Sequence, residues 1–163
     1  MKFTLSWLKE HLDTQAPLVQ IADTLTMIGL EVESVSDRSK ELAAFTVAKV
    51  LHAEKHPEAD KLSVCKVQSD IGELQIVCGA PNARAGIYVA LAKEGAYIPR
   101  DNFTIKKTKI RGVESNGMLC SADELGLGND AAGIIELPEA KIGTPIATVL
   151  GLDDPVIDVA VTP

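Results

Sequence analysis

The sequence predicts a mainly β protein that carries a few short helices, within the α+β class. Residues 45–137 hold six short runs rich in β-branched residues, and clusters of turn-forming residues separate them. Apolar residues at helical spacing occur mainly before this region. The composition, 46% hydrophobic and 24% charged, is that of a folded globular chain. Many short strands at this spacing favour a sandwich or a small barrel.

The N-terminal segment is predicted to be helical. Leu5, Leu8 and Leu12 recur at helical spacing, which predicts a first helix with one apolar face. A second helix is predicted between Pro17, which suits a helix start, and Gly29, which suits the position after a helix end. The run LEVESV that follows predicts a short strand. Two short helices bury little surface by themselves, so this segment is expected to need a partner.

The central region supplies the predicted sheet. Its expected strands are FTVAKVL (45–51), KLSVCKV (61–67), LQIVCG (74–79), IYVALA (87–92), FTIKKTKI (103–110) and GIIEL (133–137). One helical turn is expected within the region, because Ser121 and Glu124 have the spacing of a capping box and Gly126 could end the turn.

The last segment is expected to contain a short helix near residues 144–150 and an apolar strand in PVIDVAVTP. A strand this apolar should be paired with another strand and covered from water. We expect it to return to the N-terminal helices, and we expect the chain to be cut from a longer protein.

The bulk properties of the chain exclude several classes of protein. No apolar run approaches the ~20 residues that span a bilayer, and the charged start MKFTLSWLKEHL lacks the apolar core of a signal peptide. We therefore expect a soluble cytoplasmic protein with no membrane partner. The net charge of −7 argues against a generally basic nucleic-acid-binding protein.

No pattern for catalysis or metal binding stands out. The three cysteines show no C-x-x-C spacing, and the histidines lie in different local settings; these residues are Cys65, Cys78, Cys120, His11, His52 and His56. His56, which precedes Pro57, is interpreted as a surface or turn residue. The sequence contains no nucleotide-binding loop and no nucleophile motif. The chain is expected to hold no catalytic residue, no metal and no cofactor of its own.

One stretch of the chain is basic despite the acidic total. Residues 100–111 carry five Lys and Arg residues against Asp101, a local charge of +4. Lys106, Lys107, Lys109 and Arg111 could follow the phosphates of a nucleic acid, with the Arg111 guanidinium gripping a phosphate. The alternative is a solvated edge strand, since lysines on an edge prevent aggregation.

Aromatic side chains are scarce in the β region, and this bears on how a nucleic acid would be recognised. Beside Phe45 of the first expected strand, the region holds Tyr88, Tyr97 and Phe103, and aromatic residues make up 4% of the chain. Recognition of backbone and shape is therefore expected over sequence-specific stacking of bases.

The loop GAPNARAG (79–86) has two readings that the sequence leaves open. Two glycines, a proline and Asn82 within eight residues predict a tight turn. The functional reading adds Asn82 and Arg84 as exposed hydrogen-bond donors on a rigid loop.

Four motifs occur in one order: KHPEADKL (55–62), QIVCGAPNARAG (75–86), KIRGVESNGMLCS (109–121) and ELGLG (124–128). Together they resemble the tRNA-binding OB-fold domain that several synthetases and free tRNA chaperones share. The flanks MKFTLSWLKEHL, IADTLTMIGLEVE and PVIDVAVTP resemble the N-terminal part of the β subunit of bacterial phenylalanyl-tRNA synthetase.

The resemblance implies a domain plan. Residues 1–39 would form the helical part of a discontinuous small domain, and residues 149–163 would return to complete it in part. Residues 40–148 would form the inserted OB-fold barrel. The parent enzyme would be an α2β2 ligase that joins phenylalanine to its tRNA with ATP and Mg²⁺, and its active site would lie in the α subunit, outside this chain.

The resemblance also implies roles for single residues. Met118 would hold the base of the KIRGVESNGMLCS loop against the barrel. Phosphate contacts would come from Lys106, Lys107, Lys109 and Arg111. Shorter polar contacts to RNA would come from Asn82, Arg84, Ser115 and Asn116.

Two other roles compete with tRNA binding. The inserted domain could serve mainly to pack against the rest of the β subunit, which the acidic net charge favours. A free-standing homodimeric tRNA chaperone is the third reading, and the SWLKEHL start speaks against it.

Overall fold

The computed structural model describes residues 1–161 and divides into two compact units. One unit joins Met1–Glu41 to the segment that starts at Leu150, and the other is Leu42–Val149. Residues 162 and 163 of the predicted return segment 149–163 lie outside the described residues. Within the described range, no helix is both long and apolar enough to cross a bilayer.

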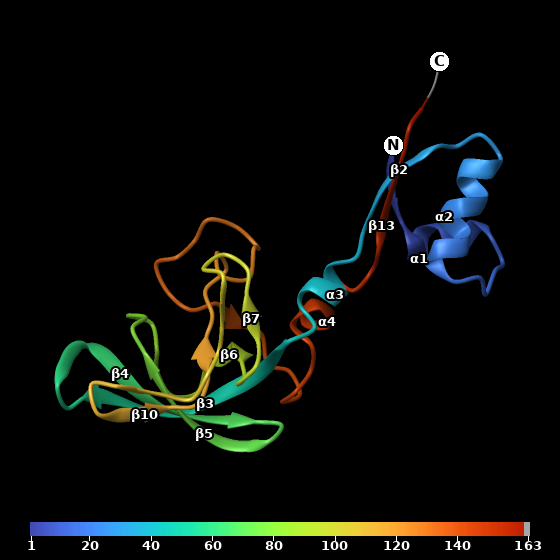
Figure 1. Cartoon of the computed structure of the whole chain (residues 1–163). Coiled ribbons are helices and arrows are strands. Elements are labelled where there is room, and N and C mark those ends of the chain that lie inside the picture. The colour runs from blue at the N-terminus through green and yellow to red at the C-terminus, as the bar shows by residue number, and fades with distance from the viewer. Residues whose placement is uncertain (162–163) are drawn as a thin grey trace. The chain divides into compact units, whose positions relative to one another are not determined.

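The first unit packs two helices against a three-stranded sheet (Figure 1). Its elements are β1 (Lys2–Thr4), α1 (Leu5–His11), α2 (Leu18–Met27), β2 (Val32–Ser36), α3 (Arg38–Glu41) and β13 (Val156–Val159). The strand order is β1-β13-β2, with both pairs antiparallel. Ile157 and Val159 of β13 are fully buried, and Ile21 of α2 packs with them. The apolar strand near the C-terminus is therefore paired on both edges and covered by a helix.

Local signals set the two longer helices of this unit. The Thr4 hydroxyl accepts a hydrogen bond from the Trp7 N–H at 3.3 Å and caps α1. Pro17 precedes α2, and Gly29 follows its end with φ = 101°, a conformation that suits glycine. The predicted helices are confirmed, with bounds that differ by one or two residues.

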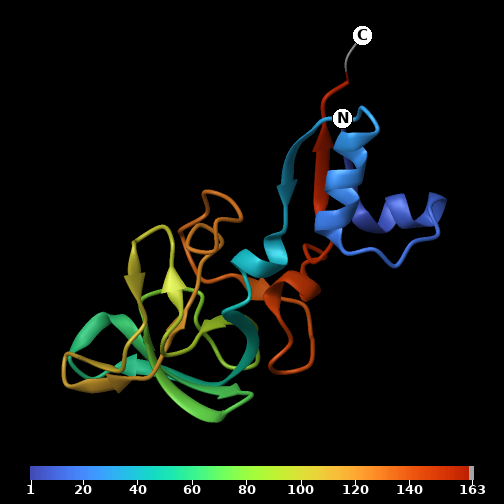
Figure 2. The same cartoon turned by 45° about the vertical axis from the view of Figure 1, so that its right-hand side comes forward.

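The second unit is built on one antiparallel sheet in the order β11-β6-β3-β4-β5, with β12 also paired to β6. Figures 1 and 2 show its long strands curving around the core. The elements are β3 (Phe45–His56), β4 (Ala59–Ser69), β5 (Gly72–Cys78), β6 (Tyr88–Ala92), β7 (Tyr97–Ile98), β8 (Phe103–Thr104), β9 (Thr108–Ile110), β10 (Val113–Ser115), β11 (Met118–Leu119), β12 (Glu136–Leu137) and α4 (Ile146–Val149).

The mainly β fold class with short helices is confirmed, but the strands do not close into a continuous barrel. In residues 1–161 no strand pairing joins β5 to β10 or β11, and the gap is bridged by separate hydrogen bonds. The Asn116 N–H donates to the Gln75 carbonyl at 2.8 Å, and the Val77 N–H donates to the Ser115 hydroxyl at 3.0 Å. The barrel that the sequence predicted is thus partly open, as small Greek-key barrels often are.

The core of this unit forms from the inward residues of the long strands. Val50, Cys65, Val67, Ile76 and Leu91 are fully buried and belong to one cluster. Alternating burial along β3 and β4 is what a sheet with one covered face requires.

Two predicted strands were wrong in extent. The run 103–110 is broken, because β8 pairs with β7 while β9 pairs with β10, and residues 105–107 make the change of partner. The run 133–137 is a strand only at Glu136–Leu137. The capping box formed as predicted: the Glu124 carboxylate accepts from the Ser121 N–H at 2.6 Å, and the Glu124 N–H donates to the Ser121 hydroxyl at 3.2 Å. It closes a turn and no α-helix follows.

Candidate nucleic-acid interface

The basic residues lie on and beside the hairpin formed by β9 and β10. Ile110 pairs with Val113, so Arg111 and Gly112 form a two-residue turn. Both have positive φ, 48° and 82°, as a type I′ turn requires. Asn-Gly is the usual pair at such a turn, and a positive φ is uncommon for a residue like arginine. The turn therefore places the Arg111 side chain at the tip of the hairpin.

The two faces of the hairpin differ in exposure. Lys109 and Glu114 are cross-strand partners on the exposed face, whereas Ser115 on the other face is buried. Lys106 and Lys107 are exposed and lie just before β9, outside any strand. Alternation between the two faces of a strand therefore begins only at residue 108.

The four cations at residues 106–111 are free of carboxylate partners. No ion pair or hydrogen bond of the Lys106, Lys107, Lys109 or Arg111 side chains is found within residues 1–161. Several other cations of the same unit are paired with carboxylates: Lys93, for example, lies 2.8 Å from Asp70. Unpaired, exposed cations in one short stretch can neutralise phosphates without first giving up an internal partner.

His56 anchors the base of this hairpin from the far end of β3. Its side chain is 3% exposed, and its Nδ1 accepts a hydrogen bond from the Glu58 N–H at 3.0 Å. The Nε2 atom must then carry the proton and donate to the Ile110 carbonyl, 3.0 Å away. His56 does flank a turn, because it pairs with Ala59 across residues 57 and 58, but the interpretation of His56 as a surface residue was wrong. Its neighbour in space comes 54 residues later, so no local signal indicated the burial.

A second anchor joins the hairpin to β5. The Gln75 side-chain amide donates to the Glu114 carbonyl at 2.9 Å. Ser115 is 2% exposed, and its hydroxyl accepts from Val77 and lies 3.3 Å from the Gly117 carbonyl. Ser115 therefore supports the hairpin from below through the hydrogen bonds of its hydroxyl. Asn116 is half-buried, and its backbone N–H bonds to β5.

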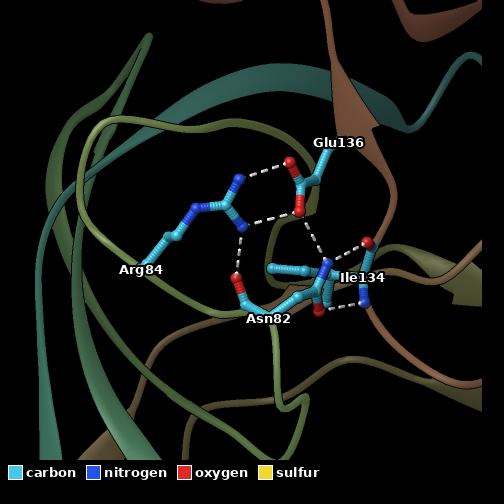
Figure 3. Close-up of polar contacts among 4 residues, drawn as sticks. All are labelled: Asn82, Arg84, Ile134 and Glu136. Atoms are coloured by element: carbon cyan, nitrogen blue, oxygen red, sulfur yellow. Dashed lines mark hydrogen bonds and ion pairs between the residues drawn. The ribbon is translucent and has the colours of Figure 1, made fainter.

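Asn82 pairs with the segment before β12 (Figure 3). Its side-chain amide donates to the Ile134 carbonyl at 2.8 Å and accepts from the Ile134 N–H at 3.0 Å, as a backbone strand partner would. A Cβ atom at Gly133 would lie 2.4 Å from the Asn82 Oδ1 atom, so this close approach needs glycine at 133.

Arg84 is held beside Asn82 by a two-pronged ion pair. Its two terminal nitrogens each lie 2.7 Å from a Glu136 carboxylate oxygen, and one also donates to the Asn82 carbonyl at 3.1 Å (Figure 3). Hydrogen bonds from Arg84 and then Asn82 lower the pKa of the Glu136 carboxyl. The GAPNARAG loop is therefore rigid, and its main polar groups are already bonded to the chain.

A cleft of about 630 Å³ opens beside the hairpin. It lies between the segment from Phe103 to Ile110 on one side and β5 and β11 on the other. Residues of three of the four motifs line it: Val77, Cys78, Gly79, Ala80, Pro81, Ile110, Ser115, Gly117, Met118, Leu119, Ser121 and Glu124. Met118 lies in β11, where it pairs with Ala92 of β6.

The titratable groups of the core offer no reactive centre. Burial raises the pKa of the Cys65 thiol to about 11, and it also raises the pKa of Cys78 and Cys120. Across the part of the chain that the structure describes, no group of three or more His, Cys, Asp and Glu residues could hold a metal ion.

Comparisons with known proteins add a family and close relatives. The family described as "Putative tRNA binding domain" matches residues 45–145. The phenylalanine–tRNA ligase beta subunit of Rhodopseudomonas palustris is 58% identical over 100% of this chain and 21% of its own length. That of Rhodospirillum rubrum is 57% identical over 100% of this chain and 20% of its own length. The chain thus spans about a fifth of these relatives.

Among solved structures, the MetRS related protein from Pyrococcus horikoshii covers 63% of this chain and 87% of its own length. Its sequence is 26% identical to this chain, and the TM-score is 0.47.

Proposed function

We propose a role in tRNA binding from a premise that the comparisons supply: the chain belongs to the family of putative tRNA-binding domains. Over its whole length it also matches the N-terminal part of phenylalanine–tRNA ligase beta subunits. In this role the chain is a non-catalytic part of such a subunit, and it binds tRNA while the enzyme works in translation.

The observation that carries this role is the exposed hairpin with its four unpaired cations. His56 and Gln75 hold the two sides of its base, so the tip is presented on a rigid support. A preorganised cation loses less conformational entropy on binding than one on a mobile loop. Phosphate contacts are proposed for Lys106, Lys107, Lys109 and Arg111.

The shorter polar residues contribute in two ways under this proposal. The Asn116 side-chain amide makes no hydrogen bond within residues 1–161, and it is proposed as a direct contact with RNA. Asn82, Arg84 and Ser115 are proposed to shape the loops beside the hairpin, because their polar groups bond to the chain itself.

The larger assembly is also a proposal. The complete beta subunit would join α subunits in an α2β2 ligase that works in the cytoplasm on the phenylalanine-specific tRNA. ATP and Mg²⁺ would be bound in the α subunit, and this chain would supply no ligand to either.

A salt titration of tRNA binding tests the role. Filter binding of tRNA is measured between about 50 and about 200 mM salt for the wild type and for a variant with Lys106, Lys107, Lys109 and Arg111 all changed to Ala. Loss of four phosphate contacts should flatten the slope of log K against log salt by about 3. The matched control changes Lys9, Lys40, Lys66 and Lys141 to Ala, all exposed and outside the hairpin.

Both variants lose the same number of positive charges, so a general electrostatic effect would weaken them equally. If the slope of log K against log salt is flattened only in the hairpin variant, the result supports tRNA binding through the hairpin. Equal behaviour of the two variants, or a wild type that does not bind tRNA, would instead favour a packing role within the subunit.

A further inference from the structure

We propose that the cleft beside the hairpin takes one unpaired nucleobase of the bound RNA, stacked on Phe103. The inference rests on the proposed tRNA binding and adds a recognition element to it. Phosphates on the hairpin alone would give binding to any RNA, whereas a base in the cleft would select RNA with an unpaired nucleotide.

The size and walls of the cleft suit a flat, largely uncharged ring. Its volume, about 630 Å³, lies within the range of about 300–1,000 Å³ for small-molecule sites. Apolar side chains and glycine backbone make up much of the wall: Val77, Gly79, Ile105, Gly117, Leu119 and Ile134.

Phe103 supplies an aromatic surface at this cleft. It lies in β8, lines the cleft and is 40% exposed. Unpaired bases of RNA commonly stack on such rings. The scarcity of aromatic residues in the sequence predicted recognition without stacking. One ring at the right place is sufficient for one base, and the structure places one there.

The three charged residues that line the cleft, Arg100, Lys106 and Glu124, differ in their partners. Arg100 forms an ion pair with Asp123, and Glu124 accepts hydrogen bonds from Ser121. Lys106 differs, since it lines the cleft and has no partner among the described residues. A neutral ring inside the cleft with its phosphate at Lys106 fits this distribution of charge better than an anion in the interior.

Lys106 also connects the cleft with the hairpin. It lines the cleft and begins the run of cations that ends at Arg111. One strand of RNA could therefore place a base in the cleft and its neighbouring phosphates on the hairpin. Thr104 and Thr108 line the same cleft, and their hydroxyls make no hydrogen bond within residues 1–161. These hydroxyls are therefore available to form hydrogen bonds with polar atoms on the edge of the base.

The test compares two exposed aromatic residues of one small hairpin. Phe103→Leu keeps an apolar side chain and removes the stacking surface. Tyr97→Leu is the matched control, because Tyr97 is 49% exposed on the neighbouring strand β7 and does not line the cleft. Fluorescence anisotropy measures the affinity of each protein for two RNAs with the same number of phosphates, a stem with an unpaired loop and a fully paired duplex.

The wild type should prefer the loop RNA. Phe103→Leu should weaken binding of the loop RNA by about tenfold or more, the scale of one stacked base, and leave duplex binding unchanged. Tyr97→Leu should change neither affinity. Phe103→Trp should retain the preference for the loop RNA, and the fluorescence of the new indole should be quenched by that RNA and not by the duplex. This variant also tests the idea if Phe103→Leu is poorly folded.

Two results would overturn the inference. If the wild type bound both RNAs with equal affinity, phosphate binding by the hairpin would stand, but the binding of a base in the cleft would be refuted. If the Phe103→Leu and Tyr97→Leu proteins bound the loop RNA with equal affinity, base binding would also be refuted, and the cleft would be a packing surface. Failure of the tRNA-binding proposal looks different, because the wild type would then bind neither RNA and the hairpin variant would show no change in salt slope.

Discussion

Replacing His56 by Ala should destabilise the Leu42–Val149 unit and loosen the basic hairpin together. The change removes both bonds of the buried ring and leaves the Glu58 N–H and the Ile110 carbonyl without these partners. Each lost bond costs about 1 kcal/mol, and the space left by the ring adds about 1–2 kcal/mol. We expect a loss of about 3–4 kcal/mol in the free energy of unfolding.

Urea unfolding at neutral pH, followed by far-ultraviolet circular dichroism, measures this loss. His52→Ala is the matched control on the same strand: His52 is exposed and lies 3.6 Å from Glu54, a contact that contributes little. It should change the stability by less than about 0.5 kcal/mol. The chain has a single tryptophan, Trp7, in the other unit, so its fluorescence transition should be unaffected by either change.

The conservative variant His56→Gln separates the two bonds from simple loss of volume. A glutamine amide has one acceptor and one donor, as the neutral imidazole has, so it can restore part of the stability. Hydrogen exchange should show faster exchange of the Val113 and Ser115 amides in the alanine variant. The reasoning would be refuted if His56→Ala matched His52→Ala in stability and left the exchange of the hairpin unchanged.

Three further predictions follow from other contacts. A hydrogen bond from Lys93 holds the pKa of Asp70 below its usual value, so the folded state binds that proton less readily than the unfolded state. This stabilisation is present above about pH 4 and is lost as the pH falls further. The free energy of unfolding, measured from pH 7 to pH 3, should therefore fall less steeply with decreasing pH for Asp70→Asn than for the wild type. Curves of equal slope for the two proteins would contradict this. The raised pKa of the buried thiols predicts that Cys65, Cys78 and Cys120 are alkylated more slowly at pH 8 in the native than in the urea-unfolded protein, by about a hundredfold at Cys65. Mass spectrometry of the labelled chain would detect a fast site, and such a site would contradict the prediction. Gly117→Ala should lower the free energy of unfolding by about 2 kcal/mol or more, because φ is 146° and the added Cβ would lie 3.0 Å from the Ala92 carbonyl oxygen. Gly112→Ala should lower it by about 1 kcal/mol, because only its positive φ opposes the substitution. Equal urea midpoints of the two variants would contradict this difference.

Local patterns were sufficient to predict most of the elements of the fold. The strands β3 to β6 follow from runs of β-branched residues between turn signals, and both longer helices follow from spacing and end residues. The break at residues 105–107 was beyond such reasoning. It arises because the chain changes its strand partner there, and the identity of a partner is a tertiary property.

The candidate site shows the same division. The cations at 106–111 and the motifs around them are visible in the sequence, because charge and spacing are local. Whether a polar side chain is already bonded within the protein cannot be seen in the sequence. Arg84 and Asn82 were predicted to be exposed donors, yet their partner Glu136 lies more than 50 residues away in the chain. His56 and Phe103 were missed for the same reason, since burial and the walls of a cleft depend on distant segments.

The strand order β1-β13-β2 has a consequence for how the chain folds while the ribosome synthesises it. Lys2 pairs with Asp158, so β1 has no strand partner until β13 has been synthesised. The Leu42–Val149 unit, by contrast, contains all partners of its own strands and can complete its ladder earlier. Until β13 emerges, the apolar side chains of Phe3, Leu8 and Ile21 remain without the strand that buries them. The order of synthesis therefore places the nascent N-terminal segment, and not the larger sheet, in need of protection from aggregation.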